Sequence, residues 1–110
     1  YSATKHIDGQ GRVLGGAILG SFDYIQNYLN PFIRHTGPTL SAFNAWVLVK
    51  SLKTLSMRVN KMNESAQQIA EFLAGQPKIS AVNYPGLKTH SGYEVAQKQM
   101  TGASLFMSAL

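Results

Sequence analysis

A lysine flanked by hydroxyl groups and followed by glycines stands near the start of this chain. Lys5 comes after Ser2 and Thr4, and Gly9 and Gly11 follow shortly after it. A neutral lysine amine attacks a cofactor aldehyde, hydroxyl groups donate hydrogen bonds to phosphate, and glycine lets the backbone turn through positive φ or approach a bulky ligand closely. An anchor for pyridoxal phosphate needs these groups, namely a Schiff-base amine and phosphate donors.

The same stretch resembles the cofactor-lysine motif of the Cys/Met-metabolism family of pyridoxal-phosphate enzymes. The motif reads Ser-Ala-Thr-Lys-x-Ile-x-Gly-Gln-Gly over residues 2–11, and the resemblance continues at 15–16, 37–46, 52–58 and 82–87. It therefore covers nearly the whole chain. The resemblance implies that Lys5 is the catalytic residue that carries the cofactor and that Ser2 and Thr4 bind the cofactor phosphate.

Residues 9–12 resemble one branch of this family. They read Gly-Gln-Gly-Arg, where the commoner family version is Gly-His-Ser-Asp, and the variant is similar to the sulfhydrylase branch. The resemblance implies a γ-replacement in methionine biosynthesis, in which O-succinylhomoserine and sulfide give homocysteine and succinate. Two alternatives stay open: the activity of a cystathionine γ-synthase or of a cystathionine or methionine γ-lyase, and a non-catalytic protein that retains the fold.

The resemblance also implies partners and a setting. Members of the family are homotetramers, so we expect a homo-oligomer that takes an amino-acid substrate together with sulfide or a thiol. Members are several times longer than these 110 residues. We therefore expect the chain to be a fragment that is inactive alone, with the residues that stack on the cofactor ring and bind the substrate carboxylate lying elsewhere.

Composition argues against several other classes of protein. The net charge of +5 would suit nucleic-acid binding, but the lysines and arginines are scattered and form no basic block. The chain has no cysteine, which excludes disulfides and a thiol nucleophile and fits a cytoplasmic location. No apolar run approaches the ~18 residues of a membrane span. The histidines at 6, 35 and 90 are too widely spread to indicate a metal site.

Arg12 admits two interpretations. It is either a solvated loop arginine or a cation that pairs with a substrate carboxylate or a neighbouring one. By contrast, the helical spacing of three large apolar residues favours a place in the core over stacking on a cofactor. These residues are Phe43, Trp46 and Met57.

The hydrophobic pattern predicts a mixture of strands and helices, and hence an α/β class. The helix over 41–52 is apolar on almost every side, which predicts burial between layers, whereas the helix over 58–73 is amphipathic. We expect a strand at 13–19, a helical segment at 22–33 capped by Ser21, broken or kinked at Pro31 and ended by Gly37, a strand at 79–84, a short helix at 92–100, and a strand within 103–110.

The resemblance places these elements in two domains of a fold of the aspartate-aminotransferase type (fold type I). Residues 1–60 are expected to be the C-terminal part of the large cofactor-binding domain, including the cofactor lysine. Residues 61–110 are expected to be the linking helix and the start of a smaller α/β C-terminal domain. The predicted boundary therefore falls near Asn60.

Overall fold

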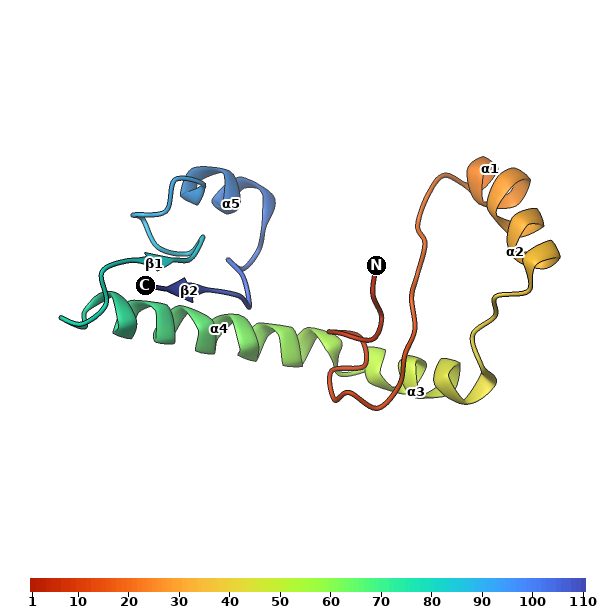
Figure 1. The fold of residues 1–110 in the computed structure, drawn as a ribbon, viewed down its shortest axis with the longest axis horizontal. Coiled ribbons are helices and arrows are strands. Elements are labelled where there is room, and N and C mark those ends of the chain that lie inside the picture. Colours follow the sequence, from red (N-terminus) through yellow and green to blue (C-terminus); the bar gives the residue numbers. More distant parts are fainter. The chain divides into compact units, whose positions relative to one another are not determined.

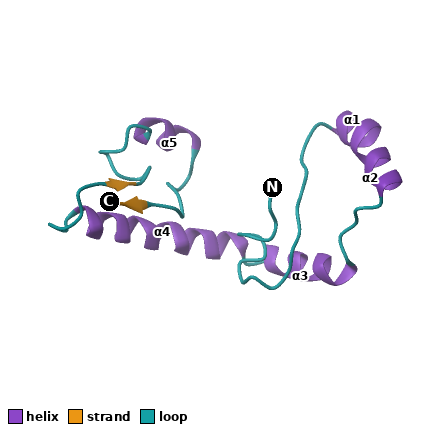
Figure 2. Cartoon of the chain, in the orientation of Figure 1, coloured by secondary structure: helices purple, strands orange, loops and turns teal.

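The computed structural model describes residues 1–110, which form two compact units, Tyr1–Leu55 and Ser56–Leu110. The chain contains both helices and strands, in agreement with the predicted α/β class (Figures 1 and 2). The predicted domain boundary near Asn60 lies inside a helix, and the assignment of the two domains stays a prediction. No helix is long and apolar enough to cross a membrane.

The elements are α1 (Phe22–Tyr24), the π-helical η1 (Ile25–Leu29), α2 (Asn30–Thr36), α3 (Ala42–Leu52), α4 (Leu55–Ala74), β1 (Val82–Asn83), α5 (Tyr93–Gln99) and β2 (Ser108–Ala109).

The first helical segment begins and ends as predicted but does not break at Pro31. Ser21 caps its start, because its Oγ accepts a hydrogen bond from the Tyr24 N–H at 3.3 Å. Gly37 ends it with φ of 81°. Of the two outcomes predicted at Pro31, a break or a kink, the break is wrong, since α1, η1 and α2 are continuous. Proline lacks an N–H and crowds the carbonyl four residues earlier, and the wider π-turn of η1 ends at Leu29, two residues before Pro31.

The predicted strand over 13–19 is wrong as well. This segment pairs with the first residues of the chain only through an isolated bridge between Ser2 and Gly16. Val13 is buried, whereas Leu14 and Ile18 are largely exposed. An apolar run identifies residues that need cover, but a strand also needs a second extended segment beside it. The described chain supplies that segment only at its first few residues.

Helix α3 agrees closely with the predicted bounds but does not show the predicted burial on every side. The Ser41 Oγ accepts from the Asn44 N–H at 3.1 Å and so caps the helix. Val47 and Leu48 are buried, yet Phe43 and Trp46 are 66% and 58% exposed. The expectation that these aromatic side chains, and the exposed Met57, lie in the core is therefore wrong for this structure. The first unit packs against only one face of α3.

The second unit is built around α4 and a small antiparallel sheet. Val82 pairs with Ala109 and Asn83 with Ser108, which confirms strands in both predicted regions, although each is shorter than predicted. The expected amphipathic helix is confirmed as α4, which buries Ala66 and Ala70 and ends just before Gly75. The short helix expected at 92–100 is confirmed as α5.

Tyr84 is the centre of the second unit's core. Its side chain is fully buried with Ala66 and Ala70, and its hydroxyl donates to the Ser104 carbonyl at 3.0 Å. Burial raises the pKa of the Tyr84 hydroxyl and the charge of Glu71 adds to this, outweighing the hydrogen bond to Ser104. The hydroxyl therefore remains a protonated donor at neutral pH.

Candidate active site

Lys5 lies on a tight series of turns and points its side chain to the exterior. The backbone closes around it, because the Asp8 N–H donates to the Ala3 carbonyl at 2.9 Å and the Gly9 N–H donates to the Lys5 carbonyl at 2.7 Å. Gly9 adopts φ of 73°, as its glycine identity predicted. The Lys5 side chain is exposed and its amine has no hydrogen-bond or ion-pair partner in the structure. That amine is accessible to a ligand.

The lysine turn, residues 3–8, is held by the residues on either side of Lys5. Ala3 is 3% exposed and packs with Val13, Val47 and Leu48. Ile7 packs against the same cluster. Burial of these neighbours leaves Lys5 on the outer side of the turn.

The two predicted phosphate donors differ in their present bonding. The Ser2 hydroxyl is exposed and makes no hydrogen bond. The Thr4 Oγ1 donates to the Gly15 carbonyl at 3.2 Å and accepts from the Gly15 N–H at 3.0 Å. Because a hydroxyl carries a single proton, Thr4 must release the Gly15 carbonyl before it can donate to a phosphate. The structure thus places Ser2 directly before the lysine turn and Thr4 within it, with only Ser2 ready to donate.

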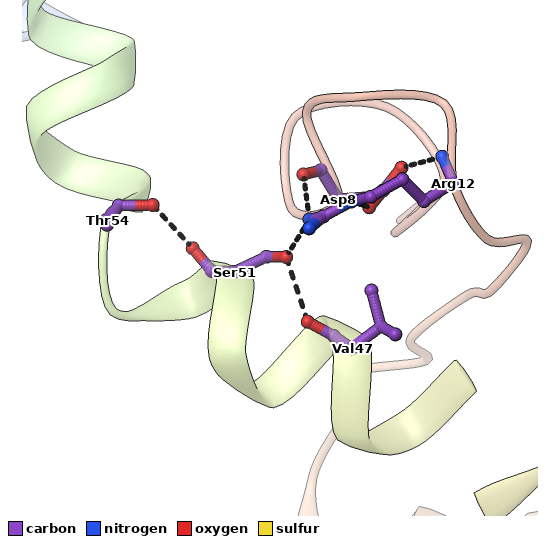
Figure 3. Close-up of polar contacts among 5 residues, drawn as sticks. All are labelled: Asp8, Arg12, Val47, Ser51 and Thr54. Atoms are coloured by element: carbon purple, nitrogen blue, oxygen red, sulfur yellow. Dashed lines mark hydrogen bonds and ion pairs between the residues drawn. The ribbon is translucent and has the colours of Figure 1, made fainter. Parts of the chain in front are cut away.

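Arg12 pairs with a neighbouring carboxylate, and its interpretation as a solvated loop arginine is wrong. Its Nε lies 3.0 Å from Asp8 Oδ1, and its backbone N–H donates to Asp8 Oδ2 at 2.6 Å. Its Nη2 donates to the Asp8 carbonyl at 3.2 Å and to the Ser51 Oγ at 2.6 Å (Figure 3). The Asp8 side chain is fully buried. The pair therefore links the lysine turn to α3.

Sequence reasoning did not identify Asp8 or Ser51. An acid four residues before a base, with two glycines between them, is the signal that could have identified the pair within the loop. Ser51 is 39 positions from Arg12, and no local pattern connects them. Only the packing of the loop on α3 brings these two side chains together.

The electrostatic environment keeps Asp8 ionised. Burial of its carboxyl raises the pKa, but the hydrogen bonds from the backbone and side chain of Arg12, and the positive charge of Arg12, lower it further than burial raises it. The net result is a pKa of Asp8 below its ordinary value of 3.8. Asp8 is therefore a carboxylate at neutral pH.

The lowered pKa of Asp8 predicts a stability contribution that depends on pH. Since the folded-state pKa lies below the unfolded-state value of 3.8, the contribution is complete above about pH 5 and is lost as the pH falls through the folded-state pKa. The melting temperatures of the wild type and Asp8→Asn should therefore differ most near neutral pH, begin to approach one another below about pH 5, and converge only once the pH falls below the folded-state pKa of Asp8. Thermal unfolding of both proteins across this range checks the expectation, and a difference independent of pH contradicts it.

Comparison with known proteins identifies the family. Residues 1–109 match the model of the family described as Cys/Met metabolism PLP-dependent enzyme. An O-succinylhomoserine sulfhydrylase from Mycobacterium tuberculosis is 60% identical over 102 residues, which are 93% of this chain and 25% of the relative. A cystathionine γ-synthase from Mycobacterium leprae is 42% identical over 93% of this chain and 26% of the relative. The chain thus spans about a quarter of the length of these curated relatives.

A solved structure agrees with this assignment. The crystal structure of cystathionine γ-synthase from Xanthomonas oryzae pv. oryzae in complex with aminoacrylate and cysteine is 35% identical, with a TM-score of 0.92. The match covers 98% of this chain and 28% of the solved chain. The chain belongs to the Cys/Met-metabolism family of pyridoxal-phosphate-dependent enzymes.

The chemistry of the lysine turn fits the family's cofactor. Lys5 offers an accessible amine that can bond to the cofactor aldehyde, and Ser2 offers a free hydroxyl for the phosphate. Thr4 can supply a second hydroxyl once it releases the Gly15 carbonyl. Gly9 and Gly11 both have positive φ, and no atom lies within 4 Å of the position that a Cβ would take at Gly11.

Proposed function

We propose that the longer protein containing this chain joins O-succinylhomoserine to sulfide and releases homocysteine and succinate. Sulfide forms a C–S bond at the γ-carbon of the substrate, and the C–O bond to succinate breaks with its electron pair leaving on the carboxylate. The observation that carries this proposal is the 60% identity to an O-succinylhomoserine sulfhydrylase. The Gly9-Gln10-Gly11-Arg12 version of the lysine motif adds support.

In this reaction Lys5 is the catalytic residue. Its Nζ would hold the cofactor covalently and, as a free amine, would move protons to and from the substrate carbons. Ser2 and Thr4 donate hydrogen bonds to the cofactor phosphate. Pyridoxal phosphate, when bound, supplies an electron sink that stabilises negative charge on the substrate carbons.

The family resemblance supports the rest of the assignment. We propose that residues 1–60 belong to the large cofactor-binding domain and residues 61–110 to the linking helix and the small domain. The whole protein is a cytoplasmic homotetramer, and the chain alone is inactive. Elution of the full-length protein as a monomer in size-exclusion chromatography with light scattering contradicts the tetramer.

The choice of acceptor tests the proposed reaction. Sulfide is small, and a pocket of uncharged groups suffices to surround it. Cysteine is zwitterionic and needs charged partners. A site shaped for one acceptor therefore leaves groups unpaired when the other binds. We expect the full-length protein to show at least about a 10-fold larger kcat/KM for sulfide than for cysteine with O-succinylhomoserine. Product analysis by mass spectrometry, with homocysteine and cystathionine as standards, gives both values.

Related proteins set the alternatives to this outcome. A preference for cysteine would assign the synthase reaction, as in the relative from Mycobacterium leprae. Release of ammonia and a keto acid without an acceptor would assign a lyase reaction, consistent with the L-methionine γ-lyase from Porphyromonas gingivalis, which is 39% identical over 101 residues. No turnover of any of these substrates would assign the non-catalytic alternative.

A further inference from the structure

The network of Asp8, Arg12 and Ser51 has no direct part in the proposed chemistry, yet it joins the lysine turn to α3 (Figure 3). We propose that Arg12 is a positioning residue that fixes the turn bearing Lys5, and that it does not bind the substrate carboxylate. This inference rests on the proposed function only in taking Lys5 as the residue that carries the cofactor.

The first part of the argument is that Arg12 closes the loop that follows Lys5. Its backbone N–H and its Nε bind the two carboxylate oxygens of Asp8, at 2.6 Å and 3.0 Å, and its Nη2 binds the Asp8 carbonyl at 3.2 Å. Gly9 and Gly11, with φ of 73° and 66°, allow the chain to return on itself between them. Charge-assisted hydrogen bonds of this kind are stronger and more directional than neutral ones. The Asp8 N–H is in turn bonded to Ala3, on the other side of Lys5.

The second part is that Arg12 ties this loop to a regular element. Its Nη2 donates to the Ser51 Oγ at 2.6 Å, and the Ser51 Oγ donates to the Val47 carbonyl at 2.8 Å. The hydrogen bonds therefore run from the loop to the backbone of α3, and each strengthens the next. A reactive group on a loop is held accurately only when its neighbours are fixed to a rigid element.

The third part is that recognition of a substrate by Arg12 would leave a buried charge unpaired. The Asp8 side chain has no exposed surface, whereas 44% of the Arg12 side chain is exposed. If the guanidinium turned outward to an external carboxylate, Asp8 would lose its counter-charge inside the protein, which is strongly unfavourable. The bonds to Asp8 and Ser51 thus assign the guanidinium to the loop.

The test compares Arg12→Gln and Arg12→Lys with Lys61→Gln in the full-length protein. Lys61→Gln is the matched control, because this substitution also removes a cation, here from an exposed ion pair in which Lys61 Nζ lies 2.9 Å from Glu64 Oε2. Two readouts are measured. Amide hydrogen exchange at Gly9, whose N–H binds the Lys5 carbonyl at 2.7 Å, is followed in the cofactor-free protein. The kcat and KM are determined for the succinyl and acetyl esters of homoserine, since only the succinyl ester carries a distal carboxylate.

We expect Arg12→Gln to speed exchange at Gly9 at least about 10-fold and to lower kcat roughly 10- to 100-fold by the same factor on both esters. Arg12→Lys should recover only part of the loss, since an ammonium cannot reproduce the forked contacts with Asp8. In an Asp8→Asn background, replacement of Arg12 should have a smaller effect than in the wild type. Lys61→Gln should change neither readout.

Three results would overturn the inference. A loss confined to the succinyl ester, with unchanged exchange at Gly9, would assign Arg12 to the substrate. Exchange accelerated equally across the whole chain would reduce its role to general stability. Unchanged exchange at Gly9 together with unchanged kcat would show that Arg12 does not position the lysine turn. Failure of the proposed function is separate: if the wild-type protein carries its cofactor on another lysine, exchange at Gly9 alone still decides whether Arg12 holds the turn.

Discussion

Replacement of Lys5 by alanine is expected to lower kcat/KM of the full-length protein at least about 10³-fold, because the proposed mechanism assigns both the covalent hold on the cofactor and the proton transfers to this one side chain. Its side chain is exposed and has no hydrogen-bond partner, so the change should alter the free energy of unfolding by no more than about 0.5 kcal/mol. Steady-state kinetics and thermal unfolding measure the two effects.

Lys53→Ala is the matched control for this experiment. Lys53 is an exposed lysine in the same unit, directly after α3, and the proposed mechanism gives it no role. It should retain the turnover of the wild type. Retained turnover in Lys5→Ala, or equal losses in the two variants, contradicts the catalytic role of Lys5.

Replacement of Tyr84 by alanine is expected to lower the free energy of unfolding by about 3–5 kcal/mol, because it leaves a cavity in the core that the surrounding side chains cannot fill. Tyr84 is fully buried. Gly86 shows how tightly this region is packed, since an added Cβ would lie 2.6 Å from Tyr84 Cε1 and 2.8 Å from Ala103 Cβ. Denaturant unfolding of the full-length protein, followed by a probe in the second unit, measures the loss.

Tyr84→Phe separates the cavity from the hydrogen bond. It keeps the ring and removes only the donor to the Ser104 carbonyl, so the expected loss is about 1–3 kcal/mol. A Tyr84→Ala variant that is no less stable than Tyr84→Phe would show that the ring does not fill the core as described.

Features governed by neighbouring residues could be predicted from the sequence. Ser21 and Ser41 cap helices because a hydroxyl directly before a helical run reaches the free N–H groups of its first turn. Gly9, Gly11 and Gly37 can take positive φ because glycine lacks a Cβ. The lysine motif itself is a local pattern, and the family match over residues 1–109 confirms the resemblance drawn from it.

Features that depend on distant parts of the chain could not be predicted. The apolar pattern of α3 identifies side chains that suit a core, but does not determine what covers them, and Phe43 and Trp46 are exposed. The apolar segment over 13–19 has the composition of a strand but lacks a neighbouring strand to form a ladder of hydrogen bonds. Ser51 becomes part of the candidate site only through contact with a loop 39 positions earlier. In each case the missing information is a tertiary neighbour.

The central claim is that Lys5 carries the cofactor, and covalent trapping tests this claim most directly. Full-length protein is saturated with pyridoxal phosphate, reduced with borohydride, digested and mapped by peptide mass spectrometry. A single pyridoxyl modification on Lys5, absent from Lys5→Ala, is the expected result. Modification of a different lysine, or of none, contradicts it.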